Sequence, residues 1–138
     1  MWVLYALLSA FFAALVAILA KLGMTGIDSN LATAIRTVVI LLLTWAVVFW
    51  TLPLSALKSL NGTNWTFLIL SGLATGLSWL FYFKALQLGP VSRVAPIDKL
   101  SVALVVVLSV VFLGEKASWQ VALGGTLIVL GSLCMIGK

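Results

Sequence analysis

The segment from Leu88 to Ser101, LGPVSRVAPIDKLS, holds the side chains of this chain that are best suited to chemistry. Asp98 and Lys99 are neighbours just after Pro96, and a long apolar run follows them. The whole chain has only eight basic and three acidic residues. A charge at the edge of hydrocarbon is costly, so it usually faces a cavity, a partner charge or the headgroups. Asp98 can therefore carry a proton or form a structural ion pair, and the sequence leaves both open.

The composition points to a lipid bilayer as the solvent. Of 138 residues, 64% are hydrophobic and 8% are charged, whereas soluble domains have about 25% charged residues. The net charge of +5 comes from dispersed residues and makes no basic face, which argues against nucleic acid as a partner. With no histidine and a single cysteine, we expect no metal site, no cofactor and no enzymatic activity.

Five apolar runs have about the 20 residues that a helix needs to cross hydrocarbon. They are residues 2–22, 31–52, 65–84, 94–113 and 119–136. The breaks between them contain turn residues, with Asp28 or Ser29 as the N-cap of the second run. The sequence therefore predicts an all-α membrane protein, with a single domain over residues 1–138 that forms a bundle of five transmembrane helices.

Aromatic and basic residues indicate how these helices are oriented. Trp2, Trp50, Trp65 and Trp119 all fall at one side of the membrane, as an interfacial belt would. The other side has more basic residues near the helix ends: Lys21, Lys84, Arg93 and Lys138. Because positive residues favour the cytoplasm, we expect a protein of the cell (inner) membrane with its N-terminus outside and its C-terminus inside.

Polar residues recur at helical spacing inside the apolar helices, on the side of the membrane that is richer in basic residues. Arg36 lies about 8 Å into the second helix, counted from residue 31, and Asp98 and Lys99 lie at a similar depth in the fourth. We expect Asp98 to pair with Arg36, with Lys99 or Lys84 as alternative partners. Lys21 and Lys84 are expected to extend to the headgroups.

The third helix carries hydroxyls in steps of three and four residues, at Ser71, Thr75, Ser78 and Tyr82. Such hydroxyls either bond neighbouring helices together or line a cavity. Trp79 and Tyr82 are the candidates for a pocket wall, because an indole or phenol in hydrocarbon needs a polar partner.

Small residues predict where helices approach one another. Gly72 and Gly76 form a GxxxG pattern in the third helix, and Gly124 and Gly131 lie in the fifth. Such glycines let another backbone come close. Contacts within the chain and contacts in an oligomer both remain open. Pro96 is expected to loosen the start of the fourth helix.

Three segments together make the chain resemble an EamA domain of the drug/metabolite transporter superfamily, in its short, five-helix bacterial form. They are GLSWLFYFKALQLGP ending at Pro90, RVAPIDKLS ending at Ser101, and FLGEK ending at Lys116. The resemblance implies one half of a ten-helix transporter built from two inverted repeats, and hence a homodimer, parallel or antiparallel. Related small multidrug resistance proteins use a glutamate in the first helix for proton exchange. Here the first helix has no carboxylate, which leaves Asp98 as the acid embedded in the membrane.

These observations favour a transporter subunit that moves a small polar metabolite by alternating access. The basic residues favour an anionic or zwitterionic substrate, with Arg36 and Lys99 attracting it and Trp79 and Tyr82 enclosing it. Asp98 would then hold Arg36 or carry a proton. The alternatives are an accessory or assembly subunit of the membrane that does not transport, and a multidrug-efflux protein.

Overall fold

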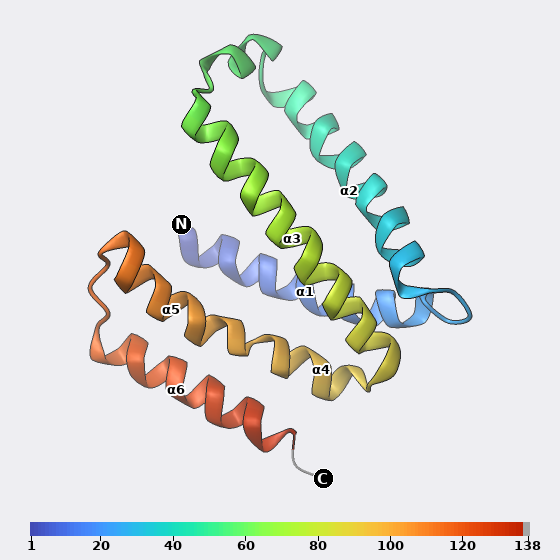
Figure 1. Cartoon of the computed structure of the whole chain (residues 1–138), viewed down its shortest axis with the longest axis vertical. Helices are drawn as coiled ribbons and strands as arrows, with labels where there is room; N and C mark the ends of the chain where they lie inside the picture. Colours follow the sequence, from blue (N-terminus) through green and yellow to red (C-terminus); the bar gives the residue numbers. More distant parts are fainter. Residues whose placement is uncertain (137–138) are drawn as a thin grey trace. The chain divides into compact units, whose positions relative to one another are not determined.

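A computed structural model describes residues 1–136, and all the regular structure in that range is helical (Figure 1). In chain order the elements are α1 (Trp2–Gly23), α2 (Ser29–Thr51), the 3-10 helix η1 (Leu54–Ser59), α3 (Gly62–Leu88), α4 (Val91–Asp98), α5 (Leu100–Leu113) and α6 (Trp119–Cys134). Lys138, one of the four basic residues predicted on the cytoplasmic side, lies outside the described residues.

The all-α membrane architecture is confirmed. α1, α2, α3 and the stretch Val91–Leu113 are each long and apolar enough to cross a membrane, and α6 is a shorter apolar helix. Several boundaries differ from those expected. α3 is longer at both ends than residues 65–84, and the fourth span begins three residues earlier than residue 94.

The fourth span is interrupted at Lys99, which separates α4 from α5. Pro96 lies inside α4 and has no N–H to donate to the carbonyl four residues earlier. After it, the Lys99 N–H donates to the Pro96 carbonyl over three residues, at 3.0 Å, which tightens the last turn of α4. The break comes three residues after Pro96, so it lies in the interior of the span and not at its start. Asp98 and Lys99 lie at this break.

The chain divides into two compact units, and each is described by itself. The first consists of Met1–Ile18 and the chain from Leu88 onward. In it α5 packs along α6, and α4 also contacts α6. α5 ends at Gly114, whose φ of 66° lies in the left-handed region, and the Glu115 N–H returns to the Ser109 carbonyl at 3.2 Å. This ending turns the chain toward α6.

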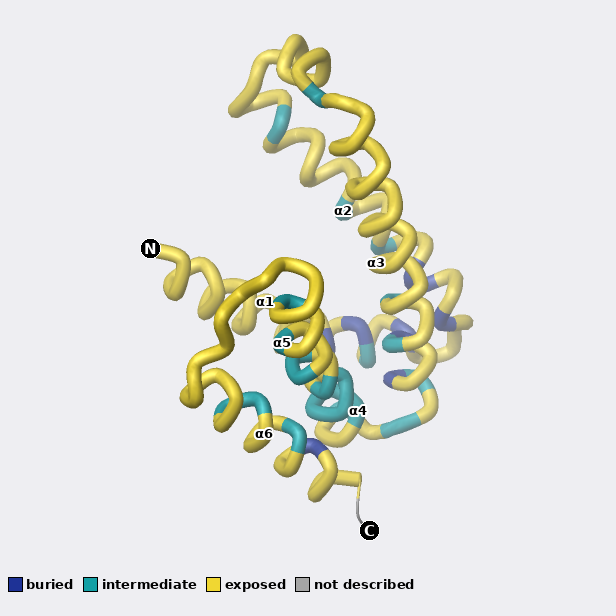
Figure 2. Tube along the Cα trace, turned by 60° about the vertical axis from the view of Figure 1, so that its left-hand side comes forward, coloured by how far each residue is buried: buried dark blue, intermediate teal, exposed yellow. Residues whose placement is uncertain are grey.

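The second unit, Leu19–Gln87, contains the end of α1, all of α2 and η1, and nearly all of α3. Its buried residues gather where α1 ends, α2 begins and α3 ends, and much of α2 and α3 beyond that point is exposed (Figure 2). They are Ala20, Met24, Ser29, Ala32, Thr33, Phe83 and Leu86. Of the two predicted N-cap residues of α2, Asp28 is the cap, because its side chain accepts a hydrogen bond from the Asn30 N–H at 2.8 Å.

Most of the large apolar side chains in the described residues are exposed, including the tryptophans expected at the membrane surface. Trp2 and Trp119 begin α1 and α6, Trp50 lies at the end of α2, and Trp65 lies in the first turn of α3. Exposed apolar surface on this scale does not occur on soluble monomers. Lipid chains are the solvent that suits it.

Candidate functional site

Arg36 is a charged residue of α2 that is only partly exposed. α2 begins at Ser29, so Arg36 lies seven residues, or about 10 Å, along the helix. Its guanidinium carbon lies over the ring of Phe83 of α3, 4.0 Å from the ring centre. The Nη1 atom of Arg36 is buried and has no hydrogen-bond partner among the described residues. Arg36 is therefore held by an aromatic ring and retains hydrogen-bonding capacity.

The predicted pocket residues lie close to this contact. The Tyr82 ring lies edge-on to the Phe83 ring, with the ring centres 5.3 Å apart. Trp79 is half-buried one turn before Phe83 on the same side of α3. Phe83, which is only 2% exposed, was not among the residues predicted for the site. The spacing of Trp79, Phe83 and Leu86 by four and three residues was the signal that could have identified it.

Lys21, at the end of α1, does not extend to the headgroups as expected. Its ammonium group donates to the carbonyl of Leu86 and, at 3.5 Å, to that of Gln87, both in the last turn of α3. The Gln87 amide in turn donates to the Ile27 carbonyl, between α1 and α2, at 2.8 Å. Lys84 is exposed and bonds to the Gln87 side chain at 3.3 Å. The ends of α1 and α3 are thus joined by polar contacts around the buried residues.

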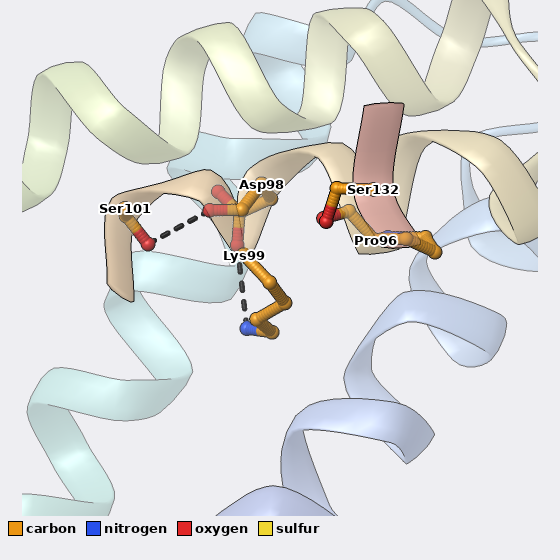
Figure 3. A network of polar contacts seen from close by, with 5 residues as sticks. All are labelled: Pro96, Asp98, Lys99, Ser101 and Ser132. Atoms are coloured by element: carbon orange, nitrogen blue, oxygen red, sulfur yellow. Dashed lines mark hydrogen bonds and ion pairs between the residues drawn. The ribbon is translucent and has the colours of Figure 1, made fainter. Parts of the chain in front are cut away.

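Asp98 and Lys99 lie in the other unit, at the break between α4 and α5 (Figure 3). Their side chains form an ion pair of 3.4 Å and are 36% and 55% exposed, respectively. The Ser101 hydroxyl donates to the backbone carbonyl of Asp98 at 2.7 Å. Lys99 was one of the alternative partners for Asp98. Arg36 belongs to the Leu19–Gln87 unit, and the preferred pairing of Asp98 with Arg36 stays a prediction.

Ser132 of α6 forms a hydrogen bond to α4 close to the same break. Its hydroxyl donates to the Pro96 carbonyl at 2.8 Å (Figure 3). Ser132 was not predictable from the sequence, because its partner lies 36 residues away and no local pattern joins the two.

Several hydroxyls of α2 and α3 bond to carbonyls of their own helices. Thr33, Thr37 and Thr44 of α2 and Thr75 of α3 each donate to the carbonyl four residues earlier. This back-bonding satisfies a hydroxyl without a neighbouring helix. Each of these threonines therefore uses its hydroxyl proton within its own helix.

The four glycines singled out for helix packing, Gly72, Gly76, Gly124 and Gly131, make no close approach within the described residues. A Cβ atom added at any of them would meet nothing within 4 Å. A role in contacts with another chain stays a prediction.

Comparison with known proteins places this architecture in a family. The model of the EamA-like transporter family matches residues 1–137. The chain is 51% identical over 134 residues to a protein of Sinorhizobium sp named "uncharacterized transporter in cobO 3'region", and the match covers 97% of this chain and 95% of that protein. No solved structure matches the chain. The helices and this match over nearly the whole length show a multi-pass membrane transporter, and the chain belongs to the EamA-like transporter family.

Proposed function

We propose that this transporter carries a small anionic or zwitterionic metabolite across the inner membrane by alternating access, and that it works as a homodimer. Arg36 binds the negative group of the substrate in this proposal, and Trp79 and Tyr82 enclose it. Lys99 adds positive charge, and Asp98 carries a proton or holds a basic side chain.

The observation that carries the proposal is the state of Arg36. A guanidinium inside an apolar helix is costly unless charge or hydrogen bonds compensate for it. The Phe83 ring supplies only part of this compensation, since cation–π contacts are worth about 0.5–2 kcal/mol. In the Leu19–Gln87 unit the one carboxylate, Asp28, accepts the Asn30 N–H at the start of α2. A carboxylate or phosphate of a substrate supplies the missing acceptor, and Arg is suited to bind it with two parallel hydrogen bonds.

Uptake into proteoliposomes tests this site. We would measure uptake of labelled succinate, glutamate and alanine by the unmodified protein and by Arg36→Ala, with Arg93→Ala as the matched control. Arg93 is an exposed residue near the start of α4. A hydrogen bond to a charged group contributes about 1.5–3 kcal/mol, so Arg36→Ala should reduce transport efficiency about ten- to hundredfold. Arg93→Ala should retain most of it.

Two results would contradict the site. If Arg36→Ala and Asp98→Asn both transport as well as the unmodified protein, then neither residue belongs to it. If the protein instead carries the cationic dye ethidium and none of the three metabolites, multidrug efflux is the better reading.

Reporter fusions at both termini test the arrangement of the dimer. Signal from both faces of the membrane for each terminus indicates dual topology and an antiparallel pair. A single orientation indicates a parallel pair or a different partner subunit. A monomer that co-purifies with another membrane protein would favour an accessory role.

A further inference from the structure

We infer that Lys21 is a positioning residue for the Arg36 site: its ammonium group fixes the end of α3 and thereby holds the Phe83 ring under the guanidinium. The inference rests on the proposed role of Arg36. Lys21 was expected from the sequence to extend to the lipid headgroups, and this inference gives it a role inside the protein.

The carbonyls at the C-terminal end of α3 need hydrogen-bond donors from outside the helix. The last four carbonyls of a helix have no partner within the helix. At the end of α3 the carbonyls of Leu86 and Gln87 accept from Lys21. These acceptors are near side chains that are fully buried, since Leu86 has 0% exposure. A cation at a helix C-terminus is further stabilised by the helix dipole, so one residue supplies both the donor and the charge.

The C-terminal end of α3 also positions the ring that contacts Arg36. Phe83 lies one turn before Leu86 and Gln87, on the face of α3 that Leu86 shares. Arg36 rests on that ring at 4.0 Å. A last turn of α3 that frays or rotates moves the ring away from the guanidinium. The position of Arg36 thus depends on a side chain that does not itself contact a substrate.

A second contact supports the same terminus. The Gln87 amide donates to the Ile27 carbonyl at 2.8 Å, which joins α3 to the connection before α2. Lys84 is close by, but it is exposed and bonds to the side chain of Gln87 rather than to a main-chain carbonyl of α3. Lys84→Gln therefore removes one positive charge from the same end of the unit without removing a donor from the α3 carbonyls, and it is the matched control.

NMR of the arginine side chains tests the inference without a substrate. The chain has two arginines, Arg36 and Arg93, so the Nε–Hε spectrum of the full-length protein in detergent contains two signals. The ring current of Phe83 shifts the Arg36 signal upfield, and Phe83→Leu defines how large that shift is. We expect Lys21→Gln to lose most of it, Lys21→Arg to restore it, and Lys84→Gln to leave it unchanged.

The milder variant Gln87→Met keeps Lys21 in place and removes the bonds of the Gln87 side chain to Ile27 and to Lys84. It should lose a smaller part of the shift, and it provides the test if Lys21→Gln does not fold. An Arg36 signal that stays at its original position in both Lys21→Gln and Gln87→Met overturns the inference.

Transport separates this outcome from the fate of the proposed function. With labelled succinate as the probe, Lys21→Gln should raise KM about tenfold and change kcat little. A substrate that is no longer oriented by Arg36 loses binding of about the size of one charged hydrogen bond. If Arg36→Ala transports succinate normally while Lys21→Gln still loses the ring-current shift, the positioning role stands and the proposed substrate site fails. If Arg36→Ala does lose uptake of succinate, but Lys21→Gln loses the shift and keeps its KM, then Lys21 supports the fold alone and the inference fails.

Discussion

Removing the hydroxyl of Ser132 should destabilise the contact between α6 and the break in the fourth span by a small and calculable amount. The Ser132 hydroxyl donates to the Pro96 carbonyl at 2.8 Å, and the side chain is buried. The same carbonyl also accepts from the Lys99 N–H at 3.0 Å. Ser132→Ala thus leaves the carbonyl with one partner rather than none.

The size of the effect follows from that second partner. Leaving a buried polar group with no hydrogen bond costs about 1–3 kcal/mol. Removing one side-chain hydrogen bond between transmembrane helices costs about 0.6 kcal/mol on average. We expect the smaller value for Ser132→Ala, which lowers the folding equilibrium constant about threefold.

Unfolding in mixed dodecyl maltoside and SDS micelles, followed by circular dichroism, measures this difference. Ser109→Ala is the matched control, because Ser109 is half-buried and its hydroxyl bonds to the Val106 carbonyl of its own helix at 3.1 Å. Such a back-bond contributes little, so this variant should unfold like the unmodified protein. Equal free energies for Ser132→Ala and Ser109→Ala would refute the reasoning. A loss above about 2 kcal/mol for Ser132→Ala would also refute it, because it would mean that the Pro96 carbonyl loses its last partner.

Two further predictions concern stability in the same micelles. Phe83→Ala should lower the free energy of unfolding by about 3 kcal/mol, the usual cost of emptying a buried aromatic site. Phe81 is 75% exposed, so Phe81→Ala should change this free energy by less than about 0.5 kcal/mol. Similar losses for the two variants would contradict the packing described. Gly114→Ala should lower the free energy of unfolding by about 1 kcal/mol, because φ is 66° at this position. Gly124→Ala, inside α6, should raise it by up to about 1 kcal/mol. Changes of the same sign in the two variants would contradict the difference in backbone conformation.

Residue types and run lengths were enough to predict the membrane-spanning elements. Apolar runs of about 20 residues have few alternatives to a membrane helix, because lipid offers no partners for an open backbone. Asp28 was predictable for a similar reason, since a carboxylate before an apolar run satisfies the first N–H groups of the helix. The break at Lys99 was only half predicted. Pro96 indicated a disturbance, but its place depends on which residues resume the hydrogen-bond ladder.

The partners of the polar side chains could not be read from the sequence. Lys21 meets carbonyls 65 and 66 residues away, and nothing local distinguishes that contact from one with lipid headgroups. Which aromatic ring meets Arg36 depends on the rotation of α3. One residue along a helix turns the side chain by about 100°, and this is the difference between Tyr82 and Phe83.

The unequal lengths of the helices have a consequence for the membrane itself. α3 has 27 residues and is about 40 Å long, whereas α6 has 16 residues and is about 24 Å long. A hydrocarbon core is about 30 Å thick. A helix that is too long adjusts by tilting, and one that is too short thins the bilayer around it. The activity of this protein should therefore vary with the acyl-chain length of the surrounding lipid, and lipids of different thickness would favour different tilts of α3.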